Sequence, residues 1–168
     1  MNLPTLPRLK QTLLTLTQWY GDFQALLVLE QEKIVSSDTQ ALAGIVHQKE
    51  EMALRIQGAE EERLALFAES ARILGLPETA LKLDRIALML PAQEAQELLV
   101  LRRGLQTAVT QAKALNEVNT QLLKDAVAYV QTAFELVTGK RNVTSGYGRL
   151  GKTTSEVRVR RNLVNTTV

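Results

Sequence analysis

Residues 98–138 read LLVLRRGLQTAVTQAKALNEVNTQLLKDAVAYVQTAFELVT, and the fold class follows from this stretch. Apolar and small side chains recur at alternating steps of three and four for more than five heptads, with Asn119 as the polar exception. This period is typical of one face of a long α-helix. Four further residues widen the stripe on one side, which favours a bundle over a strict two-stranded coiled coil: Val109, Leu123, Val130 and Val137.

The sequence before this stretch predicts two more long helices. Residues 6–35 repeat apolar side chains at steps of three and four, and Glu30 is the one polar interruption. Residues 38–74 carry a thinner apolar stripe, and Ser37 followed by Gln40 forms a capping-box pattern at its start. We therefore expect Ser37 to begin the second helix.

Glycine and proline predict where these helices stop. Gly75 fits a C-terminal cap, and Pro77 cannot continue the second helix. Residues 78–90 predict a short helix that ends before Pro91. Pro91 fits the start and Gly139 the end of the long third helix. The prediction is an all-α, elongated antiparallel bundle of three long helices plus a short connecting helix.

The third predicted helix is longer than the two helices that precede it. At about 1.5 Å per residue the three long helices measure roughly 45, 55 and 70 Å. Either the short helix covers the extra length, or an apolar end is left for another chain. Asn119, on the stripe of this third helix, is interpreted as a register-setting residue or a hydrogen bond across the bundle; the alternative is a specific partner contact.

The composition of the chain excludes several kinds of functional site. The 168 residues contain no cysteine and one histidine, His47, so disulfides, cysteine metal sites and histidine triads are not expected. Residues 1–10 have no signal-peptide core, and no apolar run is long enough for a membrane span. We interpret Trp19 and Tyr20 as core or half-exposed helix residues and His47 as solvated. No catalytic constellation is found, so neither an enzyme nor a cofactor is expected.

The charge is divided unevenly along the chain. Residues 140–168 hold seven Lys or Arg and one acid, Glu156, whereas residues 1–139 hold thirteen basic and seventeen acidic residues. The apolar stripe also ends at Gly139. The sequence therefore predicts a bundle over residues 1–139 and a flexible basic tail over 140–168.

An octamer in this tail imitates a nucleotide site. Residues 146–153, GYGRLGKT, satisfy the phosphate-loop pattern G-x-x-x-x-G-K-[ST]. Such a loop needs a strand before it, a helix after it and an acidic partner for magnesium. Helix-like residues precede it and only residues 154–168 follow, so we interpret the octamer otherwise.

Three ordered motifs resemble the FlgN family of flagellar export chaperones. Gln48-Lys49-Glu50-Glu51, followed by Glu62-Arg63, is similar to the family's Glu-Lys and later Arg signature. The last long helix carries the family's Asn-x-x-Asn-x-x-Leu-Leu as Asn116, Asn119, Leu122 and Leu123. Beyond it, the family's Tyr-Gly-x-x-Gly is similar to Tyr147, Gly148 and Gly151, although Arg149 and Leu150 depart from the usual small and acidic residues.

The resemblance implies a bacterial cytoplasmic chaperone without enzymatic activity. It implies binding of the C-terminal helical region of hook-associated junction proteins, protection from premature polymerisation, and delivery to the cytosolic domain of the flagellar export gate. By motif position, Tyr147 with Gly148 and Gly151 is expected to dock on the gate. The family's client-binding role of the tail is expected to fall on its apolar residues Leu150, Val157, Val159, Leu163 and Val164.

Two other functions remain open from the residues. A structural coiled-coil adaptor would self-associate through the long third helix, and a homodimer is compatible with either function. A binder of nucleic acid or of a membrane surface would use the basic tail, which has only Tyr147 for stacking and no dense basic cluster. We therefore expect a protein partner, no nucleic acid and no membrane insertion.

Overall fold

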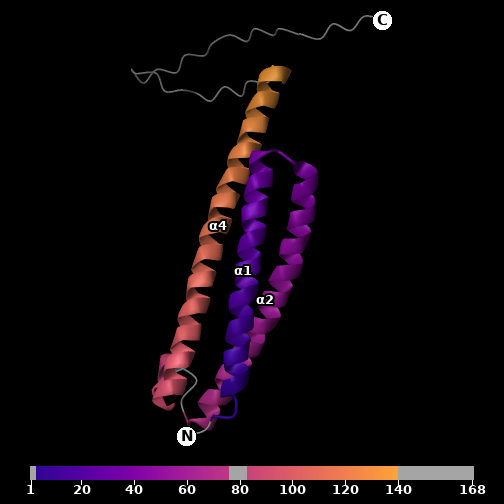
Figure 1. Cartoon of the computed structure of the whole chain (residues 1–168). Helices are drawn as coiled ribbons and strands as arrows, with labels where there is room; N and C mark the ends of the chain where they lie inside the picture. The colour runs from indigo at the N-terminus through magenta and orange to yellow at the C-terminus, as the bar shows by residue number, and fades with distance from the viewer. Residues whose placement is uncertain (1–2, 76–82, 140–168) are drawn as a thin grey trace, which may run out of the picture. The chain divides into compact units, whose positions relative to one another are not determined.

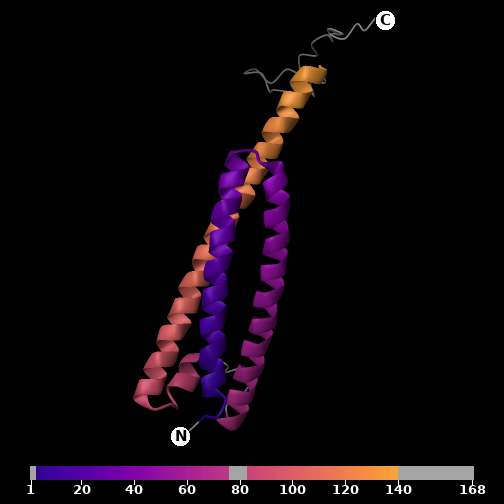
Figure 2. The ribbon, with the colours of Figure 1, turned by 45° about the vertical axis from the view of Figure 1, so that its right-hand side comes forward.

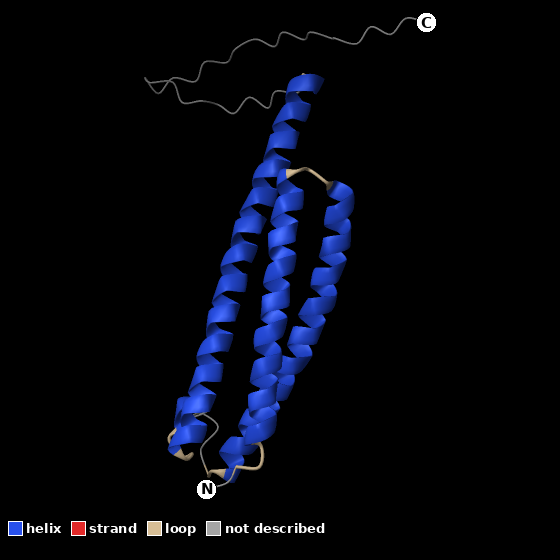
Figure 3. Ribbon diagram, in the orientation of Figure 1, coloured by secondary structure: helices blue, strands red, loops and turns tan. Residues whose placement is uncertain are grey.

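The computed structural model describes residues 3–75 and 83–139, and within these ranges it contains helices and turns but no strand (Figures 1 and 3). The predicted all-α class is confirmed. The helices are α1 (Leu6–Val35), α2 (Thr39–Ile73), α3 (Leu83–Ala87) and α4 (Ala92–Thr138). Residues 140–168 lie outside the described residues, so the predicted tail stays a prediction.

Hydrogen bonds between α1 and α4 show the relative direction of the two helices. Lys10 Nζ donates to Glu97 Oε2 at 2.6 Å, and Gln24 Nε2 donates to the Ala108 carbonyl oxygen at 2.8 Å. Residue numbers rise together on the two helices, so α4 runs parallel to α1. A short turn reverses α2 alongside α1, which gives an up–down–up order (Figures 1 and 2).

The turn between α1 and α2 corrects one sequence prediction. Ser37 has a φ of +57° and lies just past the end of α1. Its N–H donates to the Ile34 carbonyl, and the Asp38 N–H donates to the Lys33 carbonyl, which is a Schellman motif. The N-cap of α2 is Asp38, whose Oδ1 accepts from the Ala41 N–H at 3.1 Å. The capping-box assignment to Ser37 was wrong because the chain reversal holds that residue in the left-handed region.

Leucine side chains from all four helices form one core. Residues at steps of three and four on α1 meet the thinner stripe of α2, and α3 and α4 close the cluster. Each fully buried leucine contributes about 1.5–3 kcal/mol relative to an exposed one. The members with the lowest exposure are Leu3, Leu9, Leu13, Leu16, Ile86 and Leu98.

The short helix α3 is a core element rather than a mere connection. It ends at Ala87, three residues before the predicted end at residue 90, while residues 78–82 of the prediction lie outside the described residues. Its Leu83 and Ile86 side chains are buried in the core cluster. Gly75 follows α2 with a φ of +66°, as its predicted capping role requires. The chain divides into two compact units, residues 1–122 and 123–168, and α4 contributes to both.

Candidate protein-interaction site

Asn119 is the polar residue on the α4 stripe, and it is 1% exposed. Its Nδ2 donates to the Leu27 carbonyl oxygen at 2.7 Å and to Glu30 Oε2 at 2.8 Å. Both neighbours are acceptors, so the amide nitrogen has to face them. The interpretation of Asn119 as a hydrogen bond across the bundle is confirmed.

Glu30, which interrupts the α1 stripe, is also buried and receives its counter-ion from α2. Lys49 Nζ donates to Glu30 Oε1 at 2.9 Å and to Oε2 at 2.8 Å. The same ammonium donates to Asn116 Oδ1 at 3.3 Å and lies 6.0 Å from the centroid of the Phe23 ring. A buried carboxylate needs such pairing, because an isolated charge is very costly away from water.

We call Glu30, Lys49 and Asn119 the polar cluster; it joins α1, α2 and α4. Sliding any one helix by a turn would leave a buried polar group without its partner, so the cluster fixes the register of the three helices. Sequence reasoning noted each residue and missed their pairing. The available signal was that Glu30 and Asn119 interrupt two otherwise apolar stripes.

Beyond the polar cluster, the apolar side chains of α4 become exposed. Leu122 is half-buried, whereas the large apolar residues from 123 to 138 are between 38% and 82% exposed. We call this set the α4 apolar face: Leu123, Val127, Tyr129, Val130, Phe134, Leu136 and Val137.

The α4 apolar face is a candidate binding surface on energetic grounds. Monomeric proteins rarely expose large contiguous apolar patches to water, and large patches often mark sites where proteins bind one another. Most helical stability in proteins comes from packing of an apolar face, and the large apolar side chains of residues 123–138 are exposed. A partner that buries this face would remove its apolar side chains from water and would stabilise the helix.

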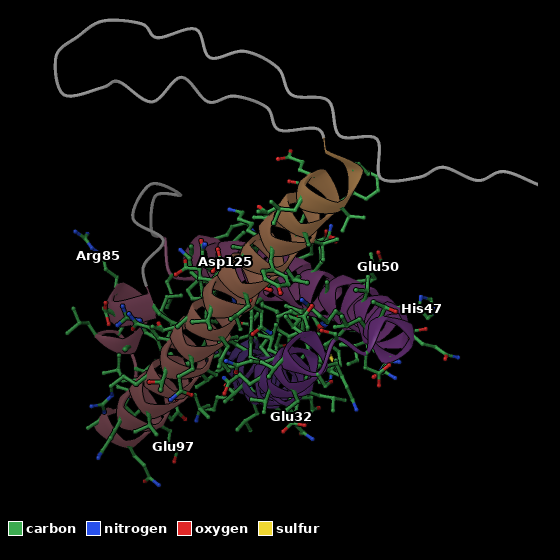
Figure 4. All side chains as sticks on the ribbon, turned by 90° about the horizontal axis from the view of Figure 1, so that it is seen from above. Glu32, His47, Glu50, Arg85, Glu97 and Asp125 are labelled. Carbon is green, nitrogen blue, oxygen red and sulfur yellow. The ribbon has the colours of Figure 1, made fainter. Side chains whose placement is uncertain are left out.

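The structure also places three other conspicuous residues, Trp19, Tyr20 and His47. Trp19 and Tyr20 are half-buried against the core, as predicted, and burial together with the Glu60 charge raises the pKa of Tyr20. His47 is 73% exposed on α2, near Glu50 and Glu51 (Figure 4). In residues 3–75 and 83–139, no group of three or more His, Cys, Asp or Glu could hold a metal ion.

The remaining predicted site residues lie outside the described part of the chain. These are the proposed gate-docking residues Tyr147, Gly148 and Gly151, the proposed client-binding residues, and the octamer 146–153. Of the Asn-x-x-Asn-x-x-Leu-Leu motif, the structure brings Asn116 and Asn119 to the polar cluster. Leu122 and Leu123 mark the change from covered to exposed side chains.

The fold defines a class: a helical-bundle protein with large apolar side chains exposed on its longest helix. The sequence profile of one family, described as FlgN protein, matches residues 1–155. The chain belongs to the FlgN family, and its general role is that of a flagellar export chaperone that binds flagellar client proteins. Searches of curated proteins and of solved structures gave no match. None of the described helices is long and apolar enough to span a membrane.

Proposed function

We propose that the chain is a cytoplasmic bacterial chaperone for hook-associated junction proteins. It binds their C-terminal helical region, prevents premature polymerisation and delivers them to the export gate. Family membership supports the class of function. The observation that carries the specific proposal is the α4 apolar face, a helical surface with large side chains left exposed.

The geometry suits a helical client. Val127, Val130, Phe134 and Val137 follow one another at steps of three and four, as the residues of one face of a helix do. An amphipathic client helix laid against them replaces water with apolar contact on both sides. Part of the binding free energy goes into ordering the helices, which keeps affinity moderate and permits release at the gate.

The tail extends this proposal without any chemical step. In the sequence, residues 140–168 follow the α4 apolar face and contain the apolar residues Leu150, Val157, Val159, Leu163 and Val164. We assign these five to client binding. Tyr147, with Gly148 and Gly151, is assigned to the export gate. Binding and release suffice for the function, so no catalytic residue or cofactor is proposed.

Titration calorimetry with the C-terminal helical region of a hook-associated protein tests the proposal. Phe134→Asp places a charge on the α4 apolar face and should weaken binding at least about tenfold. Thr132→Asp places the same charge on another side of the same helix and should bind the client like the wild-type chain. Equal affinities for these two variants, or an unchanged affinity after deletion of 140–168, would overturn the assignment.

The gate contact needs a separate readout. Tyr147→Ala should keep the affinity for the client and lose binding to the purified cytosolic domain of the export gate. A variant that binds both like the wild-type chain would contradict the role given to Tyr147.

The affinity for the client should depend only weakly on salt concentration. Binding of nucleic acid or lipid through the basic tail would instead lose affinity steeply as the salt concentration rises.

The same exposed face also favours a second function, a coiled-coil adaptor that self-associates through α4. Light scattering with size-exclusion chromatography separates the two functions. A stable dimer that dissociates when Val130 and Phe134 are made polar, and that binds no hook-associated protein, would favour the adaptor. The chaperone proposal requires instead that any self-association gives way to the client.

A further inference from the structure

Two hollows lie side by side on the α1–α2 pair and are lined by no residue of α4. The first, of about 480 Å³, includes Trp19, Leu54 and Gly58. The second, of about 430 Å³, includes Leu26, Leu29 and Met52. Arg55 lines both hollows. We call the two together the α1–α2 groove.

The groove follows one face of each helix. The lining residues of α1 extend from Arg8 to Leu29, and those of α2 from Gln48 to Glu62, at helical spacing. Twenty-one residue steps of an α-helix measure about 32 Å. The groove is therefore long enough for a helix of roughly twenty residues, which would complete a four-helix arrangement with α1, α2 and α4.

The lining of the groove mixes polar and apolar residues, and two of its leucines face water. Leu54 is 70% exposed and Leu29 is 39% exposed. A Cβ atom added at Gly58 would meet nothing within 4 Å, so the packing of this chain does not require glycine there. Glycine inside a helix costs about 1 kcal/mol relative to alanine. Its absent side chain leaves room for close approach of another backbone.

Charge defines which helix would fit. Arg8 is paired with Glu62 at 2.9 Å, so that end of the groove is neutral. Arg55 is exposed and makes no ion pair with any residue that the structure describes. Asp22 and Glu51 line the second hollow with Arg55. A complementary helix carries an acidic side chain for Arg55, apolar residues one turn to each side, and a basic residue toward Asp22 and Glu51.

We propose that the α1–α2 groove is a second docking surface, which binds an amphipathic helix of a partner protein through an acidic side chain paired with Arg55. The chain's own residues 140–168 are a poor match, because they hold seven basic residues and a single acid. The groove is built from residues of 1–122, whereas the α4 apolar face is built from residues 123–138, so the two proposed surfaces share no residue.

Photo-crosslinking of the full chain in bacteria that express it identifies the occupant. A crosslinking amino acid at Leu54 should capture a partner segment whose linked peptide has the apolar–acidic–apolar pattern, and Arg55→Glu should abolish the capture. The matched control is Leu64, which is 57% exposed on α2 and lines neither hollow; it should capture nothing. Linkage of Leu54 only to a second copy, only to residues 140–168, or to nothing would overturn the proposal.

The captured segment is then made as a peptide and titrated against the full chain. Trp19 is the only tryptophan and lines the groove, so its fluorescence should shift to shorter wavelength on binding. Arg55→Glu should lower the affinity of the chain for the peptide by about tenfold or more. Replacing the acidic residue of the peptide with lysine should restore the affinity of the Arg55→Glu variant. Wild-type affinity for Arg55→Glu, or no change in Trp19 fluorescence, would contradict the groove as the site.

Discussion

Residues 98–119 and 123–138 of α4 share one apolar period and differ in what covers it. Leu98, Leu105, Ala108 and Ala112 are buried in the first stretch, whereas every large apolar side chain of the second is exposed. The period specifies a helix with an apolar side. The period does not specify whether the chain itself or another molecule buries that side. Burial by the chain itself distinguishes residues 98–119 from the proposed binding half, residues 123–138.

Truncating one large side chain in each half should give the largest contrast. Leu98→Ala removes a side chain that is 0% exposed and should lower the free energy of unfolding by about 3 kcal/mol. Phe134→Ala removes an exposed ring and should change it by less than about 0.5 kcal/mol. Urea denaturation of both variants measures this, and similar losses would break the distinction between the halves.

The polar cluster, where the covered half ends, gives the next largest effect. Lys49→Met leaves the buried Glu30 carboxylate without its counter-ion and should cost about 2–3 kcal/mol. Adding Glu30→Gln removes the charge, keeps an oxygen for Asn119, and should recover most of the loss. Denaturation of the single and double variants near pH 7 tests this. An unchanged free energy of unfolding for Lys49→Met would contradict the role of the polar cluster in fixing the register of the three helices.

Helix propensity should affect the two halves differently. Gly104→Ala adds a methyl group that meets Thr17 Cγ2 at 4.0 Å, an ordinary contact, and should stabilise the bundle by about 0.5–1 kcal/mol. Thr132→Ala in the exposed half should raise helicity by circular dichroism and leave the denaturation midpoint unchanged. A midpoint shift of equal size in both variants would place residues 123–138 in the same cooperative unit.

A small pH effect is expected at the start of α4. The Lys10 hydrogen bond and charge lower the pKa of Glu97 below its ordinary value of 4.5, so the ionised carboxylate stabilises the fold. This contribution is present above the ordinary pKa and is lost as pH falls through the lowered one. Lys10→Met should therefore reduce stability slightly at neutral pH and match the wild-type chain in strong acid. A difference that persists in acid would contradict this assignment.

Local patterns predicted the helices well and the partners of side chains poorly. The apolar periods and the breaks at Gly75 and Gly139 predicted the long helices to within about a residue. The start of α2 was assigned to Ser37 because a capping box is a local pattern, while the reversal after α1 places that residue outside both helices.

Long-range contacts explain what could not be predicted. Glu30 and Lys49 are nineteen residues apart, and Glu30 and Asn119 are eighty-nine apart, so no spacing within one helix indicates their pairing. The groove around Arg55 likewise depends on how α1 and α2 face each other. Exposure of residues 123–138 was one of two outcomes that helix length left open.

Amide hydrogen exchange of the full chain, alone and with the helical region of a hook-associated protein, tests the role of the exposed half of α4 most directly. In the free chain, amides of residues 98–119 should be protected close to the global stability, and those of 123–138 should exchange much faster. The client should increase protection across 123–138 and leave 98–119 nearly unchanged. Equal protection of both halves in the free chain, or a client that leaves 123–138 unchanged, would contradict this account.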